Sequence, residues 1–388
     1  MSDMRLKDKT LSANTGLDAI KRAPIVEHDT GLKCIRIQDI SQGKSYDDWG
    51  FTETNEKDRK KFLLKKNDLL IARTGATVGV SQFIKEDIEA VYNNGTIRLR
   101  LDKSLNSRFV YYIFQTKSFL QYIDNISCVA TQPNLRIEGL LRFTTPDYSI
   151  EKQNAIVKTL STFDDLIENN SKRIRLLEQM AENLYNEWFV RFRFPGYEDV
   201  EFDGTLPIGW QYQPISESMD FFDSQRVPLS SMQRDGMEKI YPYYGAAKLM
   251  DYVDDYLFDG EYLLLGEDGT VVTTDGFPIL QLVNDKFWVN NHAHVIGGKG
   301  NISTRFLYLT FCRFPITGVV TGSAQPKISK GRLEKLKILV PDAITMEHFN
   351  NLINPMFDEI NVLKKQVIRI TKQRDMLLPR LMSGKLEV

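Results

Sequence analysis

The chain has 388 residues, which is more than one domain usually holds, so we expect at least two domains. Charged residues make up 26% of the sequence and hydrophobic residues 42%, a balance that excludes a disordered chain and is typical of a globular protein. The formal net charge of −1 excludes a general coat of positive charge but leaves room for a local basic groove.

The cysteines and the apolar residues indicate a cellular compartment. Cys34, Cys128 and Cys312 are odd in number and far apart, so they predict no disulfide framework and indicate a reducing environment. The sequence has no uninterrupted apolar run of about 18 residues and no signal-peptide pattern. We therefore expect a cytoplasmic protein that has no contact with a membrane.

Residues 1–148 are predicted to form a first domain of mixed helices and short strands. The strand predictions cover residues 32–37, 69–73 and 95–101, and residues 109–114 predict a short amphipathic helix.

Residues 149–194 are predicted to form a long central helix. Apolar or small residues recur at alternating spacings of four and three, with Asn170 as one polar step, which is typical of a coiled-coil seam. Ser149 is suited to cap the first turn, and Phe194-Pro195-Gly196 ends the segment. The seam positions are Ile156, Leu160, Phe163, Ile167, Asn170, Ile174, Leu177, Ala181, Leu184 and Trp188.

Residues 195–343 are predicted to form a second mixed domain, with strands at 261–265 and 277–283. Residues 344–388 follow as a second long helix. This helix repeats the spacing at Phe349, Ile353, Met356, Ile360, Leu363, Val367, Ile370, Leu377 and Leu381, with Arg374 as its polar step. Because both stripes need a partner, we expect the two helices to pair as an antiparallel coiled coil, in a register that stays open by one residue.

The two predicted domains repeat each other in the same order. A strand leads into a glycine turn at Gly75 and again at Gly269, and Gln132-Pro133 is echoed by Gln325-Pro326. Further echoes join residues 91–94 to 289–291, 109–114 to 306–311, and 143–146 to 338–341. Five echoes in one order, each series followed by a helix, indicate a duplication. The predicted fold class is α+β, with two repeated mixed domains separated by two long helices.

This arrangement resembles the specificity subunit of type I restriction-modification systems. The resemblance rests on the domain order, the sequences MAENLYNEWF and RDMLLPRLMSGKL at the helix ends, the loop ARTGATVGV and the two Gln-Pro segments. It implies that the two domains are target recognition domains, each reading one half of a bipartite, asymmetric DNA site. The helices would act as a spacer and as a docking surface.

The resemblance also implies the partners of the chain. They are double-stranded DNA, two copies of a methyltransferase subunit, and restriction endonuclease/translocase subunits. The chain would direct adenine methylation or DNA cleavage by these partners without being an enzyme. It would hold no cofactor, because S-adenosylmethionine, ATP and Mg²⁺ would be bound by the partner subunits.

The sequence motifs agree with a non-catalytic chain. Asn354-Pro355-Met356-Phe357 is similar to the catalytic tetrapeptide of amino-methyltransferases, but it lacks the second proline and lies in a predicted helix, where we interpret it as a kink. His292 and His294, with Cys312, lack a second pair of metal ligands, so we interpret the histidines as surface or groove residues.

The candidate DNA contacts are polar side chains in loops and near helix ends, where proteins present donors and acceptors to DNA. In the first domain they are Arg73, Thr74, Thr77, Asn93, Asn94, Gln132, Asn134 and Arg136. In the second they are Asn290, Asn291, His292, Ser323, Gln325, Lys327 and Lys330. Residues shared by both domains favour turns or phosphate contacts, whereas base readers are expected in unshared stretches such as residues 47–60 and 221–237.

A second hypothesis is a non-enzymatic scaffold whose two repeated domains bind protein or peptide ligands. A methyltransferase gene beside this one favours the first hypothesis, and its absence favours the scaffold.

Overall fold

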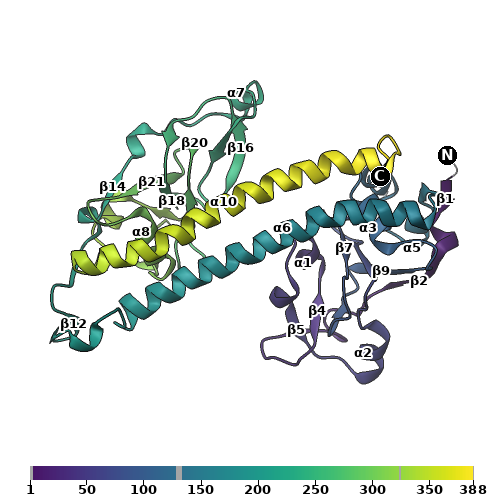
Figure 1. Ribbon diagram of the computed structural model, residues 1–388, viewed down its shortest axis with the longest axis horizontal. Helices are drawn as coiled ribbons and strands as arrows, with labels where there is room; N and C mark the ends of the chain where they lie inside the picture. Colours follow the sequence, from purple (N-terminus) through teal and green to yellow (C-terminus); the bar gives the residue numbers. More distant parts are fainter. Residues whose placement is uncertain (1–2, 128–132, 323–324, 388) are drawn as a thin grey trace. The chain divides into compact units, whose positions relative to one another are not determined.

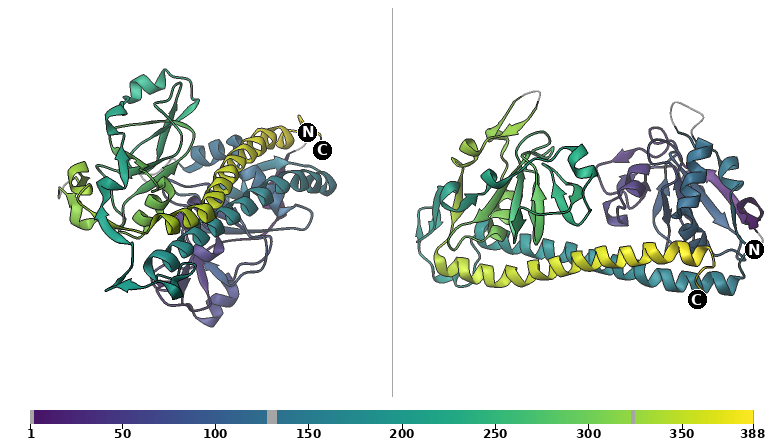
Figure 2. Two further views of the ribbon diagram at one scale, coloured as in Figure 1. Left: turned by 60° about the vertical axis from the view of Figure 1, so that its left-hand side comes forward. Right: turned by 90° about the horizontal axis from the view of Figure 1, so that it is seen from above.

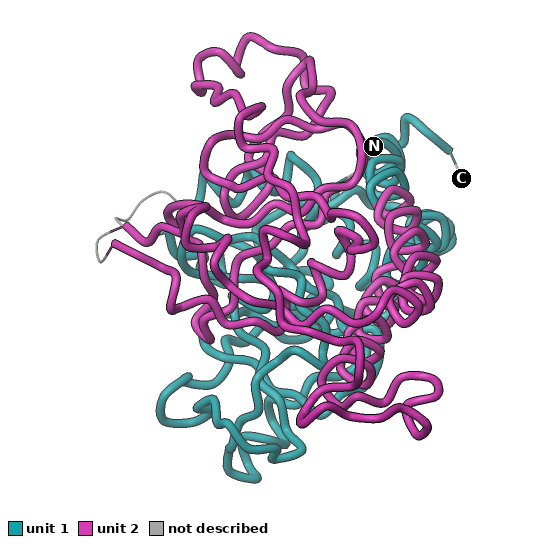
Figure 3. The backbone as a smooth tube through the Cα atoms, turned by 90° about the vertical axis from the view of Figure 1, so that its left-hand side faces the viewer, with its two compact units in different colours: residues 1–168, 368–388 teal, residues 169–367 magenta. Residues whose placement is uncertain are grey.

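The computed structural model describes residues 3–127, 133–322 and 325–387. The chain divides into two compact units, one made of residues 1–168 with 368–388 and the other of residues 169–367 (Figure 3). Both long helices run from one unit into the other. These units therefore differ from the four segments that the sequence suggests, whose boundaries stay a prediction. Among the described residues, no helix has both the length and the apolar character needed to cross a membrane.

The first unit contains two four-stranded sheets (Figure 1). One is antiparallel in the order β2, β9, β6, β7, with bounds Thr10–Thr15, Thr96–Leu101, Leu69–Ala72 and Ser81–Phe83. The other has the order β3, β5, β4, β8, with bounds Ile25–Val26, Gly50–Thr52, Lys33–Ile35 and Ala90–Tyr92. The remaining elements are β1 Asp3–Arg5, α1 Ile37–Ser41, α2 Glu56–Phe62, α3 Ser107–Phe114, α4 Lys117–Ser127, α5 Ile137–Leu141 and β10 Thr144–Pro146.

The second unit repeats this plan. One sheet has the order β14, β21, β18, β19, with bounds Met219–Phe221, Ala293–Gly298, Tyr262–Gly266 and Leu280–Val283. The other has the order β16, β15, β20, β17, with bounds Leu249–Val253, Tyr241–Tyr244, Lys286–Val289 and Phe258–Asp259. The remaining elements include β11 Phe202–Asp203, β12 Leu206–Pro207, β13 Gln211–Pro214, α7 Ser231–Asp235, α8 Thr304–Cys312, β22 Val320–Thr321, β23 Lys327–Ile328, α9 Lys330–Leu333 and β24 Lys337–Val340.

Strand pairing confirms the predicted internal repeat. In both units an antiparallel sheet is built in the same strand order, and each first strand lies at the same edge. The pair β4 and β8 is parallel, as is the pair β15 and β20. The pair β1 and β10 closes the first domain in the way that β13 and β24 close the second.

The predicted strands lie where the sequence places them, but two of them are shorter than predicted. The strand predicted over residues 32–37 ends at Ile35, because α1 begins at Ile37 and the Asp39 carboxylate accepts a hydrogen bond from the Arg36 backbone N–H. The strand predicted over residues 277–283 begins at Leu280, since Phe277 still closes a turn with Thr273.

The two long helices are α6, Ile150–Tyr185, and α10, Ala343–Met382 (Figures 1 and 2). A π-helical turn, Asn186–Val190, extends α6. The Ser149 hydroxyl accepts a bond from the Lys152 N–H at 3.4 Å, which confirms the predicted cap. The Asp342 carboxylate caps α10 by accepting from two backbone N–H groups at 3.0 Å. α10 continues through Pro355 as helix.

Within each unit the helices pack against each other through the predicted ladders, whose members are buried or half-buried. In the first unit Ile156 and Leu160, near the start of α6, share a core with Leu381 near the end of α10. In the second unit Ala181, near the end of α6, shares a core with Phe349 near the start of α10. The pairing is therefore antiparallel, as predicted.

Candidate nucleic-acid interface

In the first unit, the turn after β6 lies against the segment that leads into α5. The Leu135 N–H donates to the Arg73 carbonyl at 2.7 Å, and the Gly75 N–H donates to the Pro133 carbonyl at 3.2 Å. Gly75 has a φ of 81°, which favours glycine at this turn. The Arg73 guanidinium donates to the Asn134 side-chain oxygen at 3.2 Å. The fold therefore brings the candidates Arg73 and Thr74 next to Asn134, which is far from them in sequence.

The second unit has the same backbone connections at the turn after β18. The Ile328 N–H donates to the Glu267 carbonyl at 2.8 Å, and the Gly269 N–H donates to the Pro326 carbonyl at 3.0 Å. The Lys327 ammonium lies 3.3 Å from a Glu267 carboxylate oxygen. Matching bonds make Glu267 equivalent to Arg73 and Lys327 equivalent to Asn134.

These equivalent positions carry different chemistry. The first domain has a cation at Arg73 and an amide at Asn134, whereas the second has a carboxylate at Glu267 and a cation at Lys327. The backbone of the turn is thus common to both domains, while the groups presented there differ.

The shared asparagines shape a turn beside this place. The Asn93 side-chain oxygen accepts from the Gly95 N–H at 3.2 Å, and that of Asn290 accepts from the His292 N–H at 2.8 Å. Asn290 is only 4% exposed, so its side chain serves this turn and is not presented at the surface. Asn94, Asn291 and His292 are exposed beside it.

The other candidates divide by exposure. Arg136, Gln325 and Lys330 are exposed, and Thr77 is half-buried in the turn that follows Gly75. Lys330 also lies over the Phe221 ring at 4.8 Å. Gln132 and Ser323 lie outside the described residues.

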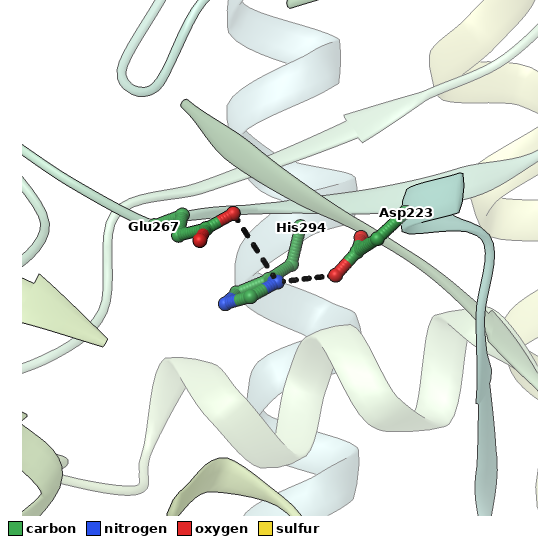
Figure 4. A group of neighbouring side chains, drawn as sticks. All are labelled: Asp223, Glu267 and His294. Carbon is green, nitrogen blue, oxygen red and sulfur yellow. Dashed lines mark hydrogen bonds and ion pairs between the residues drawn. The ribbon is translucent and has the colours of Figure 1, made fainter. Parts of the chain in front are cut away.

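A charged cluster in the second unit was missed by the sequence reasoning. It consists of Asp223, Glu267 and His294, drawn in Figure 4, together with Arg226. His294 lies on β21, and its Nδ1 is 2.7 Å from Asp223 Oδ2 and 3.8 Å from Glu267 Oε2. Its Nε2 is 2.8 Å from the Ile328 carbonyl oxygen. The interpretation of His294 as a surface or groove residue was wrong, because an inward-facing strand position leaves it 1% exposed.

Arg226 connects this cluster to the neighbouring turn. Its guanidinium donates to Glu267 Oε2 at 2.7 Å and to the Ala293 carbonyl at 2.7 Å. Burial acts to raise the pKa of the Asp223 carboxyl, but the hydrogen bond and charge of His294 outweigh burial and leave that pKa below its ordinary value. The pKa of Glu267 is lowered in the same way, against burial, by the bond from Arg226 and the nearby cations.

The three residues Asp223, Glu267 and His294 offer ligand atoms within 4.8 Å of one another, close enough to share a metal ion. However, the carboxylate of Glu267 already forms ion pairs with Arg226 and Lys327. The residues present therefore fit a self-balanced ionic cluster better than a divalent cation. An alignment of the two turns, which sets Glu267 against Arg73, is the sequence signal that could have indicated this cluster.

Comparisons with known proteins follow the same division into repeats. The model of the family described as "Type I restriction modification DNA specificity domain" matches residues 27–179 and again 207–355. The chain is 28% identical over 369 residues to the type I restriction enzyme MjaIX specificity subunit of Methanocaldococcus jannaschii, which covers 90% of this chain and 83% of that protein. It is 23% identical to the EcoprrI specificity subunit of Escherichia coli, over 79% of this chain and 77% of the relative.

A solved structure shares the fold. The crystal structure of the type I restriction-modification S subunit from M. genitalium superimposes with a TM-score of 0.61 at 17% identity, over 98% of this chain and 96% of that one. Two matches to the family model span most of the chain, and they fall on the two structural repeats. The chain therefore belongs to the family of type I restriction-modification DNA specificity subunits.

Proposed function

We propose that this chain reads a bipartite, asymmetric DNA target and directs adenine methylation or DNA cleavage by partner subunits. The observation that supports this most is the equivalent turn in the two domains, where one backbone presents Arg73 with Asn134 and the other presents Glu267 with Lys327. One scaffold with two sets of polar groups suits two different half-sites. Residues 1–148 and 195–343 would be the recognition domains, and residues 149–194 and 344–388 the helical spacers.

The exposed groups at the turns have the chemistry that base reading requires. Arginine pairs with guanine, and asparagine with adenine, through edges in the major groove. Asn94, Asn134 and Asn291 are exposed and sit on the turns described above. The exposed lysines Lys327 and Lys330 are suited to phosphate oxygens, which fix the position of a protein on the duplex.

The partners follow from the same proposal. The chain would assemble with two methyltransferase copies and with restriction endonuclease/translocase subunits in the cytoplasm. S-adenosylmethionine, ATP and Mg²⁺ would be bound by those subunits. In this assembly the present chain supplies target choice and no chemical step.

Methylome sequencing of a host that expresses the chain with its methyltransferase tests the proposal. We expect methylated adenines in one interrupted motif with two unlike halves. Arg73→Ala should relax or abolish the first half only, and Lys327→Ala should weaken the second half, because each acts within its own domain. Lys103→Ala, which removes an exposed cation away from either turn, is the matched control and should leave the motif unchanged.

A motif-free methylome would contradict target reading and favour the scaffold hypothesis. Arg73→Ala and Lys327→Ala chains that both alter the same half would contradict the assignment of one half-site to each domain.

A further inference from the structure

The buried His294 of the second domain has an oxygen atom beside each of its ring nitrogens. The Ile328 carbonyl lies 2.8 Å from Nε2 and can only accept, so the Nε2–H donates to it. A carboxylate oxygen of Asp223 lies 2.7 Å from Nδ1. The imidazole therefore bridges a carboxylate of one segment and a backbone carbonyl of another.

We propose that His294 is a positioning residue for reading the second half-site. It ties the segment that carries Lys327 to the stretch that carries Asp223 and Arg226. The inference rests on the proposed function, because it gives His294 a role in placing the groups that would touch DNA.

The bonds around His294 and Arg226 join several loop segments of the second domain. Ile328 follows Lys327 directly, and its own N–H is held by the Glu267 carbonyl at 2.8 Å. Arg226, which comes from the unshared stretch of residues 221–237, reaches the carbonyls of Asn291 and Ala293. His294 and Arg226 thus join the unshared stretch to three segments that hold candidate contacts.

Charged and aromatic groups from several elements face His294. Asp223 and Glu267 are its anionic neighbours, Arg226 lies against both, and Lys327 lies against Glu267. The Phe221 ring packs edge-on to the imidazole at 5.7 Å and carries Lys330 on its face. His292 pairs with Asp268 on the neighbouring turn. Removal of the imidazole would take away a hydrogen-bond partner from the Ile328 carbonyl, which is costly for a buried acceptor.

The first domain shows that the fold does not require a histidine here. Leu265 pairs with His294 across β18 and β21, and Ile71 pairs with Ile97 across the equivalent strands β6 and β9. Ile97 is therefore the counterpart of His294, and it is fully buried. Because the backbone bond from Leu135 to Arg73 forms without a histidine, the His294 bridge is an addition that belongs to the second domain alone.

Nuclear magnetic resonance of the full chain labelled with ¹⁵N-histidine tests the bridge. The chain has only 4 histidines, and loss of one signal in His294→Gln assigns the resonance. We expect the Nε2 hydrogen of His294 to be protected from exchange with solvent, because it is buried and bonded to the Ile328 carbonyl. A rapidly exchanging Nε2 hydrogen, or a metal ion bound at one equivalent by elemental analysis of the purified chain, would overturn the proposal.

Motif recognition tests the positioning role. His294→Gln keeps a polar side chain but lacks the ring that joins Asp223 to the Ile328 carbonyl, so we expect about a tenfold or greater loss of methylation at the wild-type motif. The loss should fall on the second half-site, with the first half still required. His294→Ile, which copies the first domain, should fold and show the same loss. His28→Gln, which breaks an exposed pair with Glu53 in the first domain, is the matched control.

The outcomes separate this inference from the proposed function. If the wild-type chain yields no bipartite motif, the proposed function fails. If the wild type yields the motif, and both His294 variants fold by circular dichroism and methylate it at the wild-type rate, only the positioning role fails.

Discussion

A single carboxylate joins three elements of the first unit. Asp164 on α6 accepts from the Tyr112 hydroxyl at 2.6 Å and from the Arg374 guanidinium of α10 at 2.9 Å. Arg108 lies 3.5 Å from the same carboxylate. Tyr112 is fully buried, and burial together with the bond to Asp164 raises its pKa. Removal of this carboxylate would leave the buried Tyr112 hydroxyl without its acceptor, and Arg108 and Arg374 would each lose one of two carboxylate partners.

We therefore expect Asp164→Ala to lower the free energy of unfolding of the first unit by about 2–4 kcal/mol. Urea unfolding measures the loss, and hydrogen exchange in α3 and α10 assigns it to this unit. The neighbouring Asp165→Ala is the control: its side chain is 60% exposed, so the same measurement should change by less than about 1 kcal/mol. Equal losses in the two variants would show that Asp164 is no more than a surface ion pair.

At the scale of elements, the hydrophobic periodicity was enough to locate the long helices, because the apolar residues of the buried face recur at every third or fourth position. The sequence also showed the polar steps Asn170 and Arg374, but it did not show which residues they contact. Asn170 donates to the Gln366 side chain at 3.1 Å within the second unit, and Arg374 reaches Asp164 within the first. Those contacts fix the register that two apolar ladders alone left open by one residue.

The candidate interface was only partly predictable. Arg73 and Asn134 could be named because they are polar residues beside a glycine turn, but their contact depends on how distant segments fold together. The burial of Asn290 could not be predicted from the sequence, because its polar side chain accepts a hydrogen bond within a turn inside the protein. The burial of His294 could not be predicted either. A buried polar ring is stable only with partners from other elements, and Asp223 lies 71 residues away in sequence.

We expect the length of the two long helices to set the gap between the half-sites. One heptad inserted at Asn170 in α6 and one at Gln366 in α10, positions that contact each other, should keep both ladders in register. A heptad adds about 10 Å of helix, which corresponds to about three base pairs of B-DNA. We expect the gap between the half-sites to lengthen while both half-sites stay the same, as read by methylome sequencing.

An insertion of four residues in each helix is the comparison, because it turns the ladder away from its partner and should abolish methylation. A heptad variant whose motif keeps the original gap would show that the helices do not set the spacing.

At the scale of the whole molecule, each domain has its own cores and its own pair of sheets. Replacement of residues 1–145 by the same segment of a relative should therefore change one half of the motif and leave the other half intact. Methylome sequencing of the hybrid beside both parents provides the measurement. A hybrid motif that is new in both halves would mean that the two domains read DNA jointly.

The bonds that hold the turns after β6 and β18 run between backbone atoms, from Leu135 to Arg73 and from Ile328 to Glu267. A backbone bond survives replacement of the side chain that projects from it. The codons for Arg73 and Asn134, and for Glu267 and Lys327, can therefore drift while the encoded domains stay folded. Under the proposed function, a heritable change of target then needs only point substitutions, and these codons are the ones to randomise in a selection for chains with new targets.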